Sequence, residues 1–507
     1  MDVWFRYFFI INSLEMKRNK LIIFLTGIIL LISSCKDFLD LEPKSEATDE
    51  NFWKSQEDAT SAVAGMYALL RVALNNGYGI AHYAYGDLSS DEISTSNTDP
   101  YHHIVNMNLG ISVVASNTSH TIYLLRRYDN FYRIIDQANR VIKYVSRMDD
   151  RSFDNVRTKN FLIGEAYFVR AFTYFYMGRI WGGVPLITDA VAPINADNLP
   201  AATAAKVMEQ SLSDVQEAKR FLEWKNLITA DFGVRANKGA AFALEAHINA
   251  WTGNYSTTIA AADSVINSEN YFYVSRDSLA YKGIFKGKSS EGIFEISQNA
   301  ANEGNSVGIA DYTLASPKYH RLYSAPRLTI TKTRIDELFS DRADKRRKYA
   351  MDTTINTSFV ICNKYSSMTY PEEGNNATPV FKNNIVIFRY SDIKLLKAEA
   401  LAATGKTVEA KAILDEVRLM CNLNSWTGSE SLIEAIFDER ARELFLEGHR
   451  FYDMVRLYKH HKIYKFLPAR MTQEQFQMGK YMWPFDPSML NQNPLLSQTS
   501  YWATVGF

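Results

Sequence analysis

The chain has no excess of charge of one sign and very little cysteine. Lysine plus arginine and aspartate plus glutamate both number 56 among 507 residues, so the formal net charge is zero. Since this composition offers no overall attraction to polyanions, we do not expect nucleic acid as a partner. Three cysteines are too few for a disulfide framework. Cys362 and Cys421 either pair with each other or, as we favour, are small buried hydrophobic residues.

The motifs of common catalytic centres are also missing. The chain has no HExxH, no Gly-x-Ser-x-Gly, no P-loop and no Rossmann glycine fingerprint in a suitable place. Glu439, Glu443 and Glu447 recur every four residues, but the interleaved arginines favour ion pairs on a helix over acid-base catalysis. Lysines on both sides of His460 and His461 disfavour a metal there. We therefore expect a protein that is not an enzyme and that uses no metal and no cofactor.

Long linkers are absent as well. Hydrophobic residues make up 47% and charged residues 22% of the chain, which is typical of a folded globular protein. No Gly/Ser-rich stretch or long run of charge divides it. We expect an N-terminal region, residues 35–230, and a C-terminal region, residues 231–507, that together form one compact module.

The amino terminus has the pattern of a secretory signal. Met16 and the basic residues Lys17, Arg18 and Lys20 precede an apolar run of about a dozen residues, 21–32. A membrane-spanning helix needs about 20 residues, so a signal peptide over residues 1–34 is favoured over a permanent span. Residues 31–35 resemble a lipobox, in which Cys35 would become the lipidated first residue of a membrane-anchored protein. Residues 1–15 fit no usual signal, and we expect translation to start at Met16.

Apolar residues recur at helical spacing in several parts of the chain. The pattern is seen in residues 57–74, 161–178, 238–251, 256–266, 391–405 and 410–421. We expect Gly178 to end its helix in a left-handed cap and Ser391 to begin the next by capping it. The last four segments form two helical hairpins, the unit of tetratricopeptide-like stacking, although no strict repeat period is present.

Other segments have the composition of loops. Residues 271–327 and 352–386 contain clusters of Gly, Asn and Ser, with short alternating strands such as Gly292–Ile296. Aromatic residues make up 13% of the chain, and a sugar can place its apolar face on an exposed ring while polar side chains bind its hydroxyls. The candidate ligand-binding residues are tyrosines in polar stretches between helical patterns: Tyr78, Tyr83, Tyr85, Tyr101, Tyr312, Tyr319 and Tyr323.

Several segments, in order, resemble the SusD/RagB family of nutrient-binding lipoproteins. In the first half these are residues 35–40, 165–172 and 182–186, and in the second half residues 389–400, 439–444, 447–456 and 493–501. The most recognisable of them reads Glu447-Gly448-His449-Arg450-Phe451-Tyr452-Asp453. The resemblance extends from Cys35 almost to the last residue.

This resemblance implies a mainly α fold and a location. A tetratricopeptide-like scaffold of helical hairpins would carry an irregular, loop-rich half with short strands that faces the ligand. The protein would be lipid-anchored in the outer membrane and face the cell surface. Ligand-contacting residues vary within the family, so no motif transfers a role to the candidate tyrosines.

The resemblance also implies a function in nutrient uptake. Members of the family bind glycan oligomers and deliver them to a SusC-like TonB-dependent transporter during polysaccharide utilisation. Because some members handle peptides instead, a peptide-binding RagB-like protein is the alternative. A surface hydrolase and a helical-repeat scaffold for protein partners stay open as further alternatives.

Overall fold

The computed structural model describes residues 52–114, 116–190, 198–298, 303, 307–316, 318–371, 373–374 and 378–506. Cys35 and the predicted signal peptide lie outside the described residues. Ser55–Phe507 forms one compact unit, to which the following description applies. The boundary between residues 230 and 231 stays a prediction. Within the described ranges, no helix is both long and apolar enough to cross a membrane.

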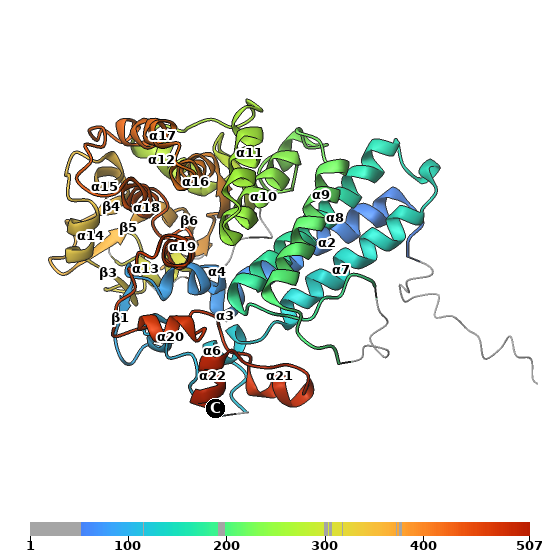
Figure 1. Ribbon diagram of the computed structural model, residues 1–507, viewed down its shortest axis with the longest axis horizontal. Helices are drawn as coiled ribbons and strands as arrows, with labels where there is room; N and C mark the ends of the chain where they lie inside the picture. Colours follow the sequence, from blue (N-terminus) through green and yellow to red (C-terminus); the bar gives the residue numbers. More distant parts are fainter. Residues whose placement is uncertain are drawn as a thin grey trace, which may run out of the picture. The chain divides into compact units, whose positions relative to one another are not determined.

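The long helices confirm a mainly α fold (Figure 1). They are α2 (Gln56–Leu74), α7 (Asp129–Arg147), α8 (Val156–Ile180), α9 (Ala204–Phe221), α10 (Lys238–Thr252), α11 (Tyr255–Ile266), α16 (Tyr390–Ala403), α17 (Thr407–Met420), α18 (Leu432–Glu443) and α19 (Arg450–His461). From α7 to α11, and on through α16, α17 and α18, each long helix packs against the next, and α2 packs against α7 and α8. Helices that are consecutive among the long ones are therefore neighbours in space, as in a stack of hairpins.

The predicted helical hairpins are confirmed. Gly253 (φ 82°) separates α10 from α11, and Gly405 (φ 79°) lies between α16 and α17. Both glycines adopt the left-handed conformation, which lacks a steric penalty only for glycine. Small side chains allow the helices to approach closely, because Ala246 and Ala250 of α10 and Ala261 of α11 pack together in the core with Leu396 of α16.

Two predicted helix ends were wrong. Helix α8 continues past Gly178 to Ile180, and the left-handed residue after it is Gly182 (φ 77°). Gly178 instead permits close packing on α9, since a Cβ atom there would lie 2.5 Å from Cε of Met208. The N-cap of α16 is Arg389, and Ser391 lies inside the helix. The Ser391 hydroxyl is occupied by tertiary contacts, because it donates to Glu291 (2.8 Å) and accepts from Arg276 (2.7 Å).

Short strands and short helices make up the remaining half. The strands are β1 (Ser94–Thr95), β2 (Gly292–Ile296), β3 (Leu328–Thr331), β4 (Met351–Asp352), β5 (Phe359–Cys362), β6 (Met368–Thr369), β7 (Val380–Phe381) and β8 (Ile385–Arg389). They pair antiparallel in a sheet of order β1-β3-β5-β4 and in the pairs β2-β8 and β6-β7. Strand β2 has the predicted bounds, and it is buried on both faces.

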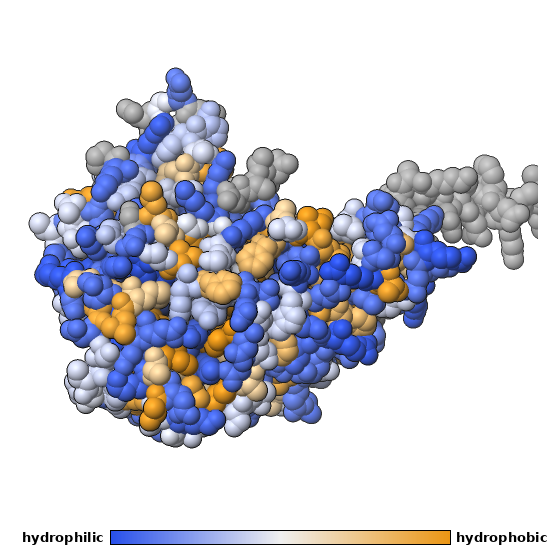
Figure 2. Space-filling model, turned by 90° about the horizontal axis from the view of Figure 1, so that it is seen from above, coloured by the Kyte–Doolittle hydropathy of each residue, from blue (hydrophilic) through white to orange (hydrophobic). Residues whose placement is uncertain are grey.

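The short helices connect these strands to the hairpin stack. They are α3 (Asn76–Gly79), α4 (Ala81–Tyr83), α5 (His102–Val105), α6 (Thr121–Leu125), α12 (Ser278–Lys286), α13 (Ile309–Thr313), α14 (Lys332–Leu338), α15 (Lys345–Ala350), α20 (Gln473–Gln477), α21 (Pro487–Gln492) and α22 (Ser500–Val505). A π-helical turn covers Ala84–Leu88, and 3₁₀ turns cover Asp150–Ser152, Thr229–Asp231 and Asn363–Tyr365. On the face shown in Figure 2, hydrophobic residues form small patches among hydrophilic ones.

Candidate functional site

The glutamates at intervals of four residues belong to a buried network of ion pairs, as predicted. Glu443 is fully buried, and its carboxylate lies 2.6 Å from Arg276, 2.7 Å from Arg389 and 3.0 Å from Arg346. Burial alone would raise the pKa of Glu443, but these arginines hold it well below its ordinary value. A general acid needs a proton to give at neutral pH, and this carboxylate has none.

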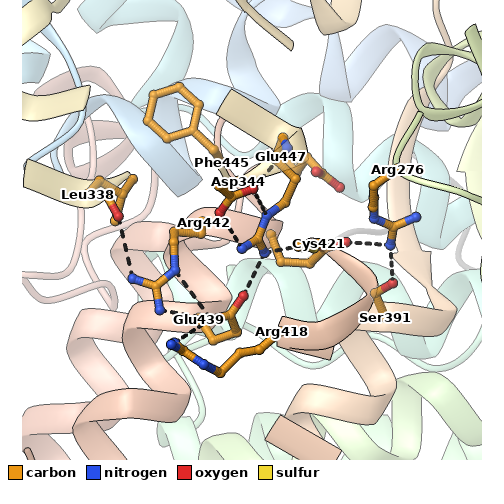
Figure 3. Close-up of polar contacts among 12 residues, drawn as sticks. Arg276, Leu338, Asp344, Ser391, Arg418, Cys421, Glu439, Arg442, Phe445 and Glu447 are labelled. Carbon is orange, nitrogen blue, oxygen red and sulfur yellow. Dashed lines mark hydrogen bonds and ion pairs between the residues drawn. The ribbon is translucent and has the colours of Figure 1, made fainter. Parts of the chain in front are cut away.

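The neighbouring glutamates are held in the same way (Figure 3). Arg442 and Arg418 point at Glu439, with nitrogen to oxygen distances of 2.8 and 3.4 Å. Glu447 lies 2.7 Å from both Arg389 and Lys364. Glu439 thus ties α18 to α17, and Glu447, just after α18, ties this segment to β8 and to the residues after β5, so the role of these carboxylates is to hold the fold together.

The two remaining cysteines are both free and buried. Burial raises the pKa of the Cys362 thiol to about 11. The pairing alternative is therefore wrong, and the favoured interpretation of two small buried residues is confirmed. No group of three or more His, Cys, Asp or Glu side chains in the described part of the chain is arranged to hold a metal ion.

Four of the seven candidate tyrosines are buried, and two of these lie outside the open cleft described below. Tyr83 and Tyr85 are 3% and 2% exposed. The ring of Tyr83 meets that of Tyr365 edge-on at 5.7 Å, and the ring of Tyr85 meets that of Trp483 at 5.0 Å. The Tyr85 hydroxyl donates to the Leu125 carbonyl (2.8 Å). In this conformation neither ring is accessible to a ligand.

Three other candidate tyrosines meet at an open cleft of about 490 Å³. The cleft is lined by Tyr78, Pro100, Tyr101, Asn117, Ser119, His120, Thr121, Val307, Asp311, Tyr312 and Arg327. These residues come from α3, from the loops on both sides of α5, from α6, from α13 and from the residue before β3. The structure thus brings together segments that are more than 200 residues apart in the sequence.

Tyr101 and Tyr312 back the wall of this cleft, and both are buried, with 1% and 2% of their surface exposed. Their rings meet edge-on at 5.0 Å, and their hydroxyls lie 2.9 Å apart. The two hydroxyls also contact the carbonyls of Gly77 and Tyr78, both at 3.1 Å. Burial raises the pKa of Tyr312 to about 12, so its hydroxyl keeps its proton at neutral pH and donates.

Tyr78 presents the exposed ring of the cleft. Its side chain is 48% exposed, and its hydroxyl donates to the Ser119 carbonyl (2.9 Å). Gly77 and Tyr78 both have left-handed backbone, with φ of 63° and 66°. Such a conformation costs a non-glycine residue roughly 1 kcal/mol or more, so the surrounding contacts must impose it. The hydrogen bonds from Tyr101 and Tyr312 to this turn do so.

Polar side chains with unpaired hydrogen-bond donors surround these rings. Nε of Arg327 donates to Asp99 (3.1 Å), and the guanidinium lies over the ring of Tyr312 at 4.8 Å. Among the described contacts, the two terminal nitrogens of Arg327 have no acceptor, and the amide nitrogen of Asn117 has none either. His120 caps α6 through Nδ1, which accepts from the Ile122 amide (3.2 Å). The cleft therefore combines an exposed ring with free donors, which suits a polar ligand that has apolar faces.

The last two candidate tyrosines lie elsewhere. The Tyr319 hydroxyl donates to Asp352 (2.9 Å) at a second cavity, on the β4 side of the sheet. The Tyr323 ring is half-buried and packs against His320 at 4.9 Å. Sequence reasoning did not identify Arg327 or Asn117. The polar run of residues 116–120 was a signal for Asn117, whereas only the tertiary structure brings Arg327 to the cleft.

Comparisons with known proteins agree with this architecture. A sequence model described as the SusD family matches residues 344–502, and another described as starch-binding associating with outer membrane matches residues 37–282. The chain is 29% identical to SusD-like protein P38 of Formosa agariphila, over 95% of this chain and 98% of that protein.

Solved structures share the fold. A SusD homolog from Bacteroides thetaiotaomicron superposes with a TM-score of 0.77 at 26% identity, over 89% of this chain and all of that one. NanU of B. fragilis superposes with a TM-score of 0.70 at 23% identity, over 90% of this chain and 99% of that one, a likeness of fold alone. With matches over both halves of the sequence, and with the helical-hairpin scaffold and loop-rich half in common, the chain belongs to the SusD/RagB family.

Proposed function

We propose that this protein is a cell-surface lipoprotein that binds glycan oligomers in the cleft around Tyr78 and delivers them to a SusC-like TonB-dependent transporter. The observation that carries the proposal is the Tyr78 ring, which is exposed over the cleft by an enforced left-handed turn. A sugar stacked on this ring would bury apolar area worth about 25 cal/mol per Å². Arg327 and Asn117 would donate to its hydroxyls.

Membership of the family supports the glycan as ligand class, because one matching family model is described as starch-binding. Of the seven candidate tyrosines, the proposal retains Tyr78 as the stacking platform and Tyr101 and Tyr312 as its support. Tyr83 and Tyr85 are left out because they are buried and, unlike Tyr101 and Tyr312, do not line the cleft.

The test is calorimetric binding of neutral and acidic oligosaccharides and peptide pools to the chain from residue 36 onward, which contains the whole unit Ser55–Phe507. Tyr78→Ala should weaken glycan binding about tenfold, since a stacked ring is worth on the order of 1–2 kcal/mol. Phe272→Ala is the matched control, because Phe272 is 55% exposed and lies outside the cleft. Equal affinities of the two variants would contradict this site.

Other results of the same assay separate the alternative functions. Binding of peptides without any glycan would favour a RagB-like peptide-binding protein. Sustained release of product from a bound glycan would show a hydrolase, whereas the proposal expects the glycan to be recovered intact.

The location and the partner have tests of their own. Cys35→Ser should move the protein from the membrane fraction to the soluble fraction, because the lipid anchor would be lost. We expect the native protein to co-purify from outer membranes with a TonB-dependent transporter. Retention of the Cys35→Ser variant in the membrane would contradict the lipid anchor.

A further inference from the structure

A second cavity, of about 610 Å³, lies beside β4 and is rich in cations. Its lining includes Lys282 of α12, Lys318, Arg342, Arg347 and Lys348 around α15, and Asp352 of β4. Helix α12 packs against α15, and α15 packs against β4 (Figure 1). Five cationic side chains thus face one lining carboxylate, in a chain whose net charge is zero.

Part of this charge is neutralised within the protein. Lys318 lies 2.5 Å from Asp352. Arg347 pairs with Asp336, just outside the lining, and Arg342 lies 4.0 Å from that same carboxylate. Counting both carboxylates against the five cations still leaves a local excess of positive charge.

Lys282 and Lys348 account for most of that excess. Lys282 is half-buried, and no ion pair or hydrogen bond of its ammonium is among the described contacts. Burial and the neighbouring Lys318 lower its pKa, as expected for a cation that lacks a counter-charge. The Lys348 ammonium lies 5.1 Å from the centre of the Tyr349 ring and acts on Asp277 only at longer range.

Neutral polar groups complete the lining. Tyr319, Thr353, Thr354 and Asn363 contribute hydroxyls and an amide. Tyr319 and Thr354 already donate to Asp352, so an anion at this position would accept from the lysines, and it would relieve the repulsion between Lys282 and Lys318. We propose that this pocket binds the carboxylate or sulfate groups of an acidic oligosaccharide; that the ligand is an oligosaccharide rests on the function proposed above.

The position of the pocket fits one ligand that reaches both sites. Both cavities lie along the sheet of order β1-β3-β5-β4. Arg327 of the cleft directly precedes β3, which pairs with the edge strand β1. The cationic pocket lies at β4, the strand at the other edge. Two strand spacings, about 10 Å, separate β3 from β4. Asp311 and Tyr312 of the cleft are also close in sequence to Lys318 and Tyr319 of the pocket. An oligomer with its sugar face on Tyr78 can therefore extend toward the lysines.

The test uses the chain from residue 36 onward and three probes: oligogalacturonate, a sulfated galactan oligomer and a neutral maltooligosaccharide. Lys282→Gln/Lys348→Gln removes two cations that make no described ion pair. Lys225→Gln/Lys406→Gln is the control, because it removes the same net charge from exposed positions outside both cavities.

The pocket variant should bind the acidic probe about tenfold more weakly than native protein, and the difference should shrink at high salt. Its affinity for the neutral probe should match that of the control variant. Comparison of the carboxylated and sulfated probes identifies the anionic group that is recognised. Equal affinity of the two lysine variants for acidic probes, or failure of the native protein to bind either acidic probe, would overturn the proposal.

The Tyr78→Ala variant distinguishes failure of the cationic pocket from failure of the cleft proposed as the glycan site. If Lys282→Gln/Lys348→Gln lost affinity for the acidic probes and Tyr78→Ala did not, the result would support the pocket and contradict the cleft. A loss in Tyr78→Ala alone would support the cleft and overturn the pocket.

Discussion

The network under α18 and the two open cavities use the same kinds of side chain with opposite results. Around Glu443 every charge meets several partners, and three arginines converge on one carboxylate. In the cleft beside Tyr78 and in the pocket of Lys282, some hydrogen-bond donors point into the open cavity, because no nearby acceptor among the described contacts binds them.

The difference shows that residue type does not distinguish a structural charge from a binding one. A buried charge is stable only when its partners replace water, so the network must be complete. A binding site must instead leave some hydrogen-bond donors and charges unpaired for its ligand. The backbone strain or charge repulsion that results is offset by the stability of the surrounding fold.

Removing one partner from the complete network should have the largest effect. Glu443→Ala should lower the free energy of unfolding by about 3–5 kcal/mol, because Arg276, Arg389 and Arg346 would lose a shared counter-charge while staying buried. Urea denaturation measures this change. Glu209→Ala, which breaks an exposed pair with Lys206, is the control and should leave the midpoint nearly unchanged. A similar small shift in both variants would show that the network is not what stabilises this region.

Glu295 is an intermediate case, buried like Glu443 but without an ion pair among the described contacts. Burial raises its pKa to about 7, although Asn384 (2.9 Å) and the Lys288 amide (3.0 Å) donate to it. Between its unfolded pKa of about 4.5 and 7 the folded state keeps a proton that the unfolded state loses, so stability falls as pH rises through this window.

Glu295→Gln removes this titration. The variant should gain up to about 3 kcal/mol relative to native protein between pH 4.5 and 7.5, at about 1.4 kcal/mol per pKa unit. Urea unfolding of both proteins at several pH values measures the difference. A difference that stays constant over this range would contradict the raised pKa.

Arg327→Lys tests whether the unpaired hydrogen-bond donors of the cleft contribute to glycan binding. Lysine keeps the charge but lacks the second terminal nitrogen, so glycan affinity should fall about five- to tenfold while stability stays near native. Calorimetry measures the first and thermal unfolding the second. Arg133→Lys, at an exposed position of α7, should change neither. Unchanged affinity in Arg327→Lys would remove this side chain from the site.

Tyr83→Phe should have the smallest effect. The Tyr83 ring lies in the core, and its replacement keeps the packing with Tyr365. We expect glycan affinity to stay within about twofold of native, since no ligand reaches this hydroxyl. Calorimetry with the probe used for Tyr78→Ala checks this. A large loss would mean that the core around Tyr83 opens on binding.

The helical scaffold was largely predictable. Helix positions follow from apolar residues at a spacing of about 3.6, and the glycines at 253 and 405 separate the hairpins as expected. The ends at Gly178 and Ser391 were mispredicted because distant neighbours determine them: Met208 packs on one, and Glu291 and Arg276 bind the other.

The site was predictable only in part. Tyr78 and Tyr83 occur in the same polar, glycine-containing stretch, yet one is 48% and the other 3% exposed. Tyr83 is followed by a π-helical turn whose Gly86 packs so closely on Gly448 that a Cβ atom would lie 2.1 Å from the Gly448 carbonyl oxygen. This contact joins segments more than 350 residues apart, so no local pattern reports it.

By itself, the sequence determined the class of the protein: ordered family segments, helices at their 3.6-residue period and a balanced charge, all of which are properties of the chain read in order. The tertiary structure alone decided which tyrosine presents its ring and which lysines face a cavity without a counter-charge. The physical reason is that exposure and pairing depend on which distant segments cover a side chain, and Lys282 and Lys348 meet only because α12 packs on α15.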